Sequence, residues 1–272
     1  MRLWRFFSIL SIDIALGAVL CCAFMARVLG VTLLVHAYIA LGLIVWIIYT
    51  VDHLLDASQG APEPSTARHG FHRDHWKPLA GLAFAAMCAV AIEVFFVRKP
   101  VFYAGLGVAL LVIVYLAVQR SLSFFKEAAG ALLYTAGVVA APVSLLGQGL
   151  STSQWGLVVL LGLTAYTNLM ICSSYDVETD LLDGHRSFVT EFGTGIAQRI
   201  IYGSLALSAS VAIFLVLIFN VEWTAILVFL VMNVMLFAVF QLPKVFSGSE
   251  RFRLIADLAF LVPGIYLLVD AL

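Results

Sequence analysis

Two pairs of aspartates in the sequence have a spacing of four residues. Asp52 and Asp56 follow one apolar stretch, and Asp176 and Asp180 follow another. On a helix, residues four apart lie on one face about one turn apart, so each pair presents two neighbouring carboxylates. Carboxylate oxygens suit Mg²⁺, which commonly shares its coordination sphere with substrate phosphates. Two such pairs from different helices predict a magnesium site that holds a diphosphate.

The elements that must position these pairs are membrane helices. Of 272 residues, 63% are hydrophobic and only 11% are charged, with a mean hydropathy of +1.06. A soluble domain has about 25% charged residues, so soluble enzymes, disordered proteins and nucleic-acid-binding proteins are excluded. The four cysteines all lie in apolar stretches and indicate no disulfide framework. The composition predicts an integral, multi-pass protein of the lipid bilayer.

About 20 apolar residues are needed for a helix to cross the hydrocarbon, and the chain has nine such stretches. The predicted spans cover residues 6–26, 31–50, 78–97, 100–119, 128–147, 154–174, 197–219, 222–242 and 253–271. The sequence therefore predicts an all-α, polytopic transmembrane bundle of nine helices, formed by a single domain over residues 1–272.

Basic residues predict the orientation of this bundle. With a cytoplasmic N-terminus, only Arg27, Arg98 and Lys99 of the 15 Lys and Arg residues lie on the outer side, which is the positive-inside pattern. Two long polar segments, at about 51–77 and 175–196, are predicted as loops on the inner side. One aspartate pair alone is more simply a solvated helix end. Two pairs on one side favour a functional site on the cytoplasmic face.

The second pair belongs to a longer pattern. Residues 176–187 read Asp-x-x-x-Asp-x-x-x-Gly-x-Arg-Ser, and Phe192-Gly193 follows. After the fourth predicted helix, Tyr115 is followed by Arg120 five residues on and by Gly130 ten residues after that. With the helix count, these motifs resemble the UbiA superfamily of intramembrane prenyltransferases over nearly the whole chain. The first aspartate motif departs from the family pattern, because Ile48 and Tyr49 replace its leading Asn-Asp.

The resemblance implies a Mg²⁺-dependent enzyme that transfers a prenyl group from a prenyl diphosphate to an aromatic or other lipophilic acceptor. It implies four catalytic, metal-binding residues, Asp52, Asp56, Asp176 and Asp180. The implied substrate-binding residues are Tyr115, Arg120, Lys126, Arg186 and Ser187. Arginine presents a planar fork to phosphate oxygens, whereas lysine acts as a point charge.

Asn168 is predicted to lie deeper in the bundle than the diphosphate. It lies seven positions before Tyr175, which is two helical turns deeper on nearly the same face. We expect it to line a pocket together with Tyr49 and Tyr166. Aromatic rings stabilise cations through their quadrupole, and the same attraction would act on an allylic carbocation.

Other polar residues have weaker functional claims. Arg68 and Arg73 are predicted as ordinary inner-face charges, and Glu93 as a residue that reaches the outer interface. Asp13 and Asp257 lie within apolar stretches, and a cavity wall and a structural contact between helices are equally compatible with them. The inner-face histidines are predicted as solvated loop residues or phosphate contacts rather than zinc ligands. They are His53, His69, His72, His75 and His185.

Two alternatives remain open. A membrane terpene cyclase of the same superfamily would ionise the same donor, and the donor's own double bonds would capture the cation. A cyclic hydrocarbon formed without any acceptor would identify it. The other alternative is a non-catalytic binding or transport protein that keeps the fold, which would bind or move its ligand without releasing diphosphate.

Overall fold

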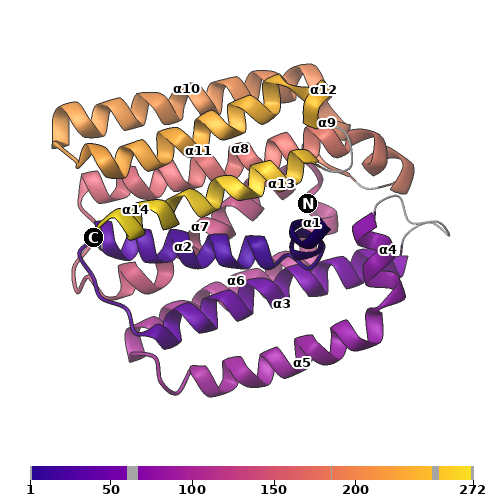
Figure 1. The fold of residues 1–272 in the computed structure, drawn as a ribbon, viewed down its shortest axis with the longest axis horizontal. Helices are drawn as coiled ribbons and strands as arrows, with labels where there is room; N and C mark the ends of the chain where they lie inside the picture. The colour runs from indigo at the N-terminus through magenta and orange to yellow at the C-terminus, as the bar shows by residue number, and fades with distance from the viewer. Residues whose placement is uncertain (1, 60–66, 185, 247–250, 271–272) are drawn as a thin grey trace.

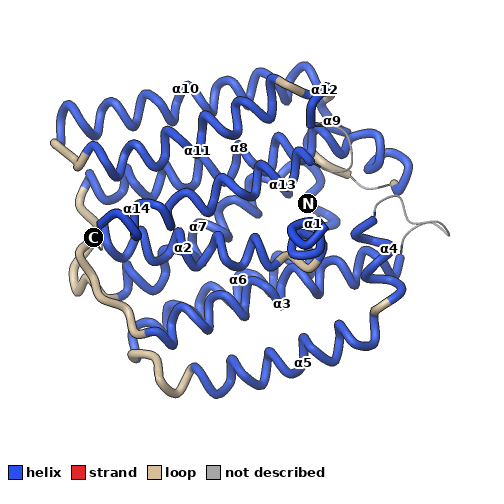
Figure 2. Tube along the Cα trace, in the orientation of Figure 1, coloured by secondary structure: helices blue, strands red, loops and turns tan. Residues whose placement is uncertain are grey.

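Helices make up almost all of the structure, a computed structural model that describes residues 2–59, 67–184, 186–246 and 251–270 (Figures 1 and 2). These ranges contain no strand. Within them, the side chains of residues 2–5, 56–59, 67, 69, 120, 121, 123, 183 and 270 are left undescribed.

Fourteen α-helices and two short 3₁₀ helices lie in the described ranges. They are α1 Arg2–Ile9, α2 Ile12–Val28, α3 Val35–Gln59, α4 Ala67–Asp74, α5 Trp76–Glu93, α6 Lys99–Leu122, η1 Ser123–Phe125, α7 Lys126–Ser144, α8 Thr152–Asp183, α9 Phe188–Phe192, α10 Thr194–Phe219, α11 Trp223–Gln241, α12 Pro243–Phe246, α13 Arg251–Leu258, η3 Ala259–Leu261 and α14 Val262–Asp270.

Eight helical segments of the described chain are long and apolar enough to cross a membrane. They are Val35–Leu55, Trp76–Glu93, Lys99–Gln119, Lys126–Ser144, Thr152–Leu182, Thr194–Phe219, Trp223–Gln241 and Arg251–Val269. Helix α2, with 17 residues, lies among them. The predicted all-α membrane bundle is confirmed, whereas the count of nine crossing helices stays a prediction. Large apolar side chains on the outside of the bundle, such as Phe84 and Ile113, are 72% and 62% exposed, as expected for a lipid-facing surface.

The first predicted span, residues 6–26, is wrong as a single helix. Helix α1 ends at Ile9, and Ser11 takes the left-handed conformation with φ of 55° before α2 begins at Ile12. The backbone carbonyl of Leu10, at the break, accepts a hydrogen bond of 2.9 Å from the indole N–H of Trp46 in α3. A side chain from another helix thus supplies a hydrogen bond at the point where the intrahelical ladder is interrupted.

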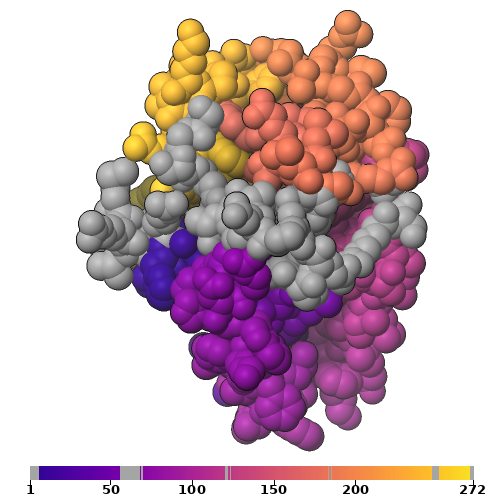
Figure 3. All heavy atoms as spheres, turned by 90° about the vertical axis from the view of Figure 1, so that its right-hand side faces the viewer, coloured from indigo at the N-terminus to yellow at the C-terminus, as the bar shows by residue number. Residues whose placement is uncertain are grey.

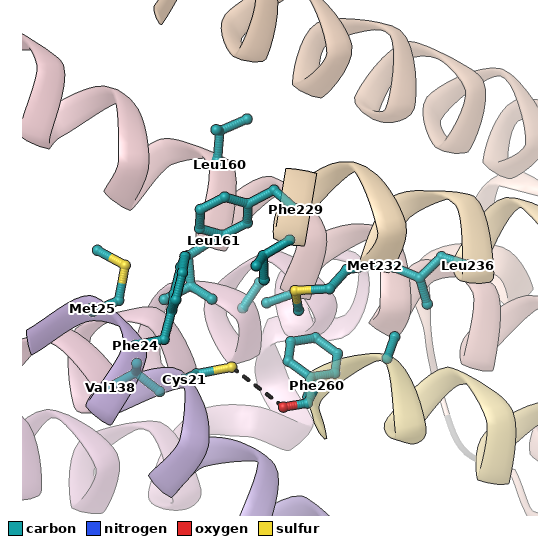
Figure 4. Packing of buried hydrophobic residues seen from close by; sticks show 14 of the residues in the cluster. Cys21, Phe24, Met25, Val138, Leu160, Leu161, Phe229, Met232, Leu236 and Phe260 are labelled. Carbon is teal, nitrogen blue, oxygen red and sulfur yellow. Dashed lines mark hydrogen bonds between the residues drawn. The ribbon is translucent and has the colours of Figure 1, made fainter. Parts of the chain in front are cut away.

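The core is centred on α2, which packs against α3, α7, α14 and η3. Small residues on its buried face allow this close packing. Phe24 meets Phe229 of α11 edge to face, with ring centroids 5.5 Å apart. The thiol of Cys21 donates to the carbonyl oxygen of Phe260 at 3.7 Å (Figure 4). Next to Phe260 the last span is interrupted by η3, because Pro263 has no N–H for the carbonyl of Ala259.

The ends of α3, α6 and α8 gather at one end of the bundle, beside α4 and α9 (Figure 1). Figure 3 looks onto this end and shows α4 in purple and α9 in coral on the same face. Helix α8 has 32 residues and rises roughly 48 Å, which exceeds the ~30 Å of hydrocarbon. Its last turns therefore extend beyond the apolar layer, at the end where both aspartate motifs lie.

Candidate functional site

The second aspartate pair lies on a helix and not in a loop. Asp176 and Asp180 occupy the last turns of α8, where both are partly exposed. The helix continues to Asp183, and Gly184 ends it in the left-handed conformation with φ of 70°. The predicted loop over 175–196 is thus wrong, because no residue before Gly184 interrupts the helix. The predicted loop over 51–77 is wrong as well, since it contains the end of α3 and all of α4.

Ser187 begins the short helix α9. Its hydroxyl accepts a hydrogen bond from the backbone N–H of Thr190 at 3.4 Å, and the Thr190 hydroxyl accepts one from the N–H of Ser187. These reciprocal bonds form a capping box, and Ser187 is buried. The Gly-x-Arg-Ser motif therefore ends one helix and starts the next. Its predicted role in substrate binding stays a prediction.

Arg186 projects from this turn and pairs with Glu191 of α9. Its Nε lies 2.5 Å from Glu191 Oε1, and the arginine side chain is 63% exposed. The hydrogen bond between them lowers the pKa of Glu191 and raises that of Arg186. Both groups are therefore ionised at neutral pH, and the exposed guanidinium is held beside the turn between α8 and α9.

Glu127 of α7 holds the turn between α8 and α9 in place. No sequence pattern had indicated this residue. It is buried at the start of α7. Its Oε1 accepts hydrogen bonds from the Ser173 hydroxyl of α8 at 2.8 Å and from the backbone N–H of Phe188 at 3.0 Å. A carboxylate near the N-terminus of a helix is favoured by the helix dipole. The neighbouring Lys126, a predicted diphosphate contact, begins the same helix and is partly exposed.

The first aspartate motif is joined to α6. Asp52 Oδ1 accepts a hydrogen bond of 3.0 Å from the side-chain amide of Gln119. A Cβ added at Gly130 of α7 would lie 3.9 Å from the hydroxyl of Tyr115, so this tyrosine lies beside the glycine as α6 and α7 pack together. The side chains of Asp56 and Arg120, both predicted site residues, lie outside the described part of the structure.

Tyr49 of α3 interacts electrostatically with Asp52 on its own helix and with Asp257 of α13. It also interacts with Tyr115 of α6 and Cys172 of α8. Of the predicted site residues, Asp52 and Tyr115 therefore lie in the neighbourhood of this ring.

An ion pair joins α8 to α13. A guanidinium nitrogen of Arg253, Nη2, contacts Asp176 Oδ2. The preceding residue, Phe252, stacks in parallel on Tyr175 with ring centroids 4.4 Å apart. The hydroxyl of Tyr175 donates to the carbonyl of Val239 in α11 at 2.6 Å. Arg253 was one of several inner basic residues in the sequence, and only the approach of α13 to α8 distinguishes it.

A set of buried polar side chains lies deeper in the bundle than this ion pair. The side-chain amide of Asn168 donates to Asp257 Oδ1 at 3.4 Å. Asp13, Arg68 and Arg253 are charged residues that interact with the Asp257 carboxyl. Asp13 and Asp257 are 2% and 7% exposed. Among the described residues, Oδ2 of each has no hydrogen-bond partner. The two intramembrane aspartates thus face one interior region, which Asn168 also borders.

Arg68 is an interior residue and not the inner-face charge that we predicted. It is 4% exposed, and its Nη2 donates to the Ser8 carbonyl of α1 at 2.9 Å. Its Nη1 lies 3.4 Å from Nε2 of His53. His72 donates through Nδ1 to the Arg68 carbonyl, and the His53 and His72 rings lie 5.0 Å apart. These two histidines are buried, so the expectation of solvated loop side chains is wrong for both.

Two further charged residues have partners of their own. Oε2 of Glu93 lies 2.7 Å from Nδ1 of His36, and the expectation that Glu93 reaches the outer interface stays a prediction. Arg73 is exposed beside Asp74, with 3.7 Å between Nε and Oδ1. Within the described ranges, no group of three or more His, Cys, Asp or Glu side chains is placed to hold a metal ion.

Comparison with known proteins gives matches among solved structures. No protein-family model matches the chain, and no curated protein sequence does. The apo structure of a UbiA homologue from Aeropyrum pernix K1 matches with a TM-score of 0.72 at 13% identity, over 95% of this chain and 98% of that one. A UbiA homologue from Archaeoglobus fulgidus bound to DMAPP and Mg²⁺ matches with a TM-score of 0.65 at 14% identity, over 98% and 99% of the two chains.

This chain has the UbiA fold. The same Archaeoglobus fulgidus homologue bound to GPP and Mg²⁺ gives a TM-score of 0.67 at 14% identity, over 97% of each chain. The resemblance predicted from the sequence motifs is therefore confirmed as a likeness of fold over nearly the whole length. The UbiA fold also agrees with the apolar surface and the eight apolar helices, which together indicate an integral, multi-pass membrane protein.

Proposed function

We propose that this chain is a divergent, single-domain member of the UbiA superfamily that transfers a prenyl group from a prenyl diphosphate to a lipophilic acceptor. The observation that carries the proposal is the match in fold to homologues bound to DMAPP or GPP with Mg²⁺. The location of Asp52, Asp176 and Asp180 on helices whose ends lie at the same end of the bundle supports it further. The excess of basic residues on the same side supports a cytoplasmic location for this end.

The donor set suits a divalent metal in its chemistry. Asp176 and Asp180 are one turn apart on α8 and offer the carboxylate oxygens that Mg²⁺ prefers. Oδ2 of Asp176 is paired with Arg253, however, so the guanidinium competes with a metal ion for this oxygen. Asp52 and Asp56 are the proposed ligands on α3. When bound, Mg²⁺ neutralises the charge that develops on the departing diphosphate.

The remaining chemistry belongs to the chain's own residues. Arg120, Lys126 and Arg186 contact the diphosphate oxygens. The bond between C1 of the prenyl group and the bridging oxygen breaks, and the diphosphate leaves with the electron pair. The acceptor then forms a bond to C1 and loses a proton. Tyr49 and Asn168 face the allylic cation from the apolar side, where exclusion of water prevents its hydrolysis.

The test uses purified protein in detergent with DMAPP or GPP, Mg²⁺ and a panel of lipophilic acceptors. We expect release of diphosphate and formation of a prenylated acceptor. Asp176→Asn or Asp180→Asn should lower the rate by about 100-fold or more, because charge stabilisation at the leaving group is lost. The matched control is Glu178→Gln, an exposed acidic residue between the two aspartates, which should retain the wild-type rate. Absence of diphosphate release from the wild type, or full activity of Asp176→Asn, contradicts the proposal.

A second candidate is a binding protein without catalysis. The engagement of Asp176 by Arg253 and of Asp52 by Gln119 favours it, because both carboxylates already have protein partners. Such a protein would bind the prenyl diphosphate in the same assay and release none. The cyclase alternative is separated by omitting the acceptor and analysing the hydrocarbon products.

A further inference from the structure

The ion pair between Asp176 and Arg253 places a resident cation on a carboxylate of the candidate diphosphate site. Both side chains are mostly buried but accessible from the end of the bundle, at 21% and 26% exposure. A ligand that enters there therefore meets the pair directly. An Arg–carboxylate pair of this kind is strong enough to compete with an incoming metal ion for the carboxylate.

The position of Arg253 is fixed by its neighbours. Phe252 lies flat against Tyr175, the residue before Asp176, with an interplanar angle of 4°. The Arg253 guanidinium carbon lies 5.7 Å from the centroid of the Phe252 ring. Tyr175 is itself held by its hydrogen bond to Val239. The start of α13 is thus packed onto α8, so Arg253 stays near Asp176 whether or not the ion pair is formed.

A second carboxylate lies behind the guanidinium. Asp257 is one turn further along α13 and interacts electrostatically with Arg253. It is buried, and Asn168 is its hydrogen-bond donor. Arg253 therefore contacts the partly exposed Asp176 and also interacts with the buried Asp257. If Asp176 turns to a metal ion, the guanidinium still has a counter-charge behind it and is not left isolated in an apolar surrounding.

We propose that Arg253 is a diphosphate-binding residue that pairs with Asp176 in the empty site and transfers to the diphosphate when substrate and metal arrive. This inference rests on the proposed function, which supplies the diphosphate and the metal. In the empty state the guanidinium neutralises Asp176. In the loaded state the metal ion takes the carboxylate, and the planar fork of Arg253 binds diphosphate oxygens. The pair therefore couples metal binding to diphosphate binding.

Binding measurements without catalysis test this, with Mn²⁺ and inorganic pyrophosphate as probes and isothermal titration of the full chain in detergent. Arg253→Gln should bind Mn²⁺ about tenfold more tightly than the wild type when pyrophosphate is absent, because Asp176 is no longer occupied. With Mn²⁺ present, the same variant should bind pyrophosphate about tenfold more weakly, since a charged hydrogen-bond donor is lost. Both affinities of Arg253→Lys should lie between those of the wild type and those of Arg253→Gln, because lysine lacks the bidentate fork. Arg251→Gln, at an exposed arginine two residues away, is the matched control and should change neither affinity.

A second variant, Asp176→Asn, should raise the affinity for pyrophosphate instead of lowering it. This test does not depend on whether Arg253→Gln is stable. Asp176→Asn releases Arg253, so it should bind pyrophosphate more tightly than the wild type when no metal is present. Adding Arg253→Gln to Asp176→Asn should abolish that gain. If metal-free pyrophosphate affinity is unchanged in Asp176→Asn, and metal-dependent affinity is unchanged in Arg253→Gln, the role of Arg253 is refuted while the proposed function stands. A wild-type protein that binds neither Mn²⁺ nor pyrophosphate refutes the proposed function itself.

Discussion

The carboxylate of Glu127 in α7 accepts hydrogen bonds from the backbone N–H of Phe188 in α9, at 3.0 Å and 3.3 Å from its two oxygens. It also accepts one from the Ser173 hydroxyl of α8. One buried side chain thus ties together three helices around the turn that carries Arg186.

Removing this carboxylate should loosen the turn. We expect Glu127→Ala to cost about 1–3 kcal/mol for each buried donor left without an acceptor. Glu127→Gln should cost less, because an amide oxygen still accepts. Thermal unfolding in detergent measures the difference, and limited proteolysis between residues 184 and 193 reports local opening. An alanine variant with the wild-type melting temperature and protease resistance would contradict this account.

Arg68 should be required for stability, although it looks like a surface charge in the sequence. It is buried, contacts Ser8 and His53, and interacts with the Asp257 carboxyl. Arg68→Ala removes one of the two cations that interact with this buried carboxyl, and we expect a loss of about 3–5 kcal/mol. Arg73→Ala, on the same helix but exposed, should change stability by less than about 0.5 kcal/mol. Equal melting temperatures for the two variants would show that the burial of Arg68 contributes nothing.

Gly17 of α2 lies tightly against Phe260 of the last span. A Cβ at this position would lie 2.9 Å from the Cβ of Phe260, which cannot move without its backbone. Gly17→Ala should therefore destabilise the protein by about 1–3 kcal/mol through overpacking. Gly137→Ala is the matched control in α7, because a Cβ there meets nothing within 4 Å. The control should gain up to about 1 kcal/mol from helix propensity. Comparing the melting temperatures of the two variants separates the steric effect at Gly17 from the effect of helix propensity.

The Arg186–Glu191 pair predicts a pH effect with a definite sign. Because Arg186 lowers the pKa of Glu191 below its ordinary value of 4.5, the ion pair is complete at neutral pH. Its contribution is lost as the pH falls through that lowered pKa. Glu191→Gln should free Arg186 and tighten pyrophosphate binding by about two- to fivefold at pH 7. The gain should shrink at high salt and as the pH falls through that lowered pKa, because wild-type Glu191 then becomes neutral as well. A gain that is independent of both salt and pH would point to another cause.

The sequence was sufficient for the bundle because apolar length is set by the thickness of the bilayer. Seven of the predicted spans coincide with single described helices to within nine residues at each end. The break at Ser11 was missed, because nothing in the apolar run marks it and the compensating donor, Trp46, comes from a different helix. The helical extension of α8 through Asp183 was missed because a polar helix end and a polar loop have the same composition.

The candidate site was predicted in part for a similar reason. Carboxylate spacing along one helix is visible in a sequence, and so Asp176 and Asp180 could be paired. Partners that are distant along the chain are not visible. Arg253 is 77 residues from Asp176, and Glu127 is 61 residues from Phe188. Sequence position alone could not separate these residues from ordinary charges near helix ends.

The break between α1 and α2 has a consequence for the order in which the molecule is made. The carbonyl of Leu10 receives its donor from Trp46, and the carbonyl of Ser8 receives one from Arg68. Both donors leave the ribosome after the segment that they serve. The segment around the break can therefore complete these two hydrogen bonds only after α3 and α4 have been synthesised.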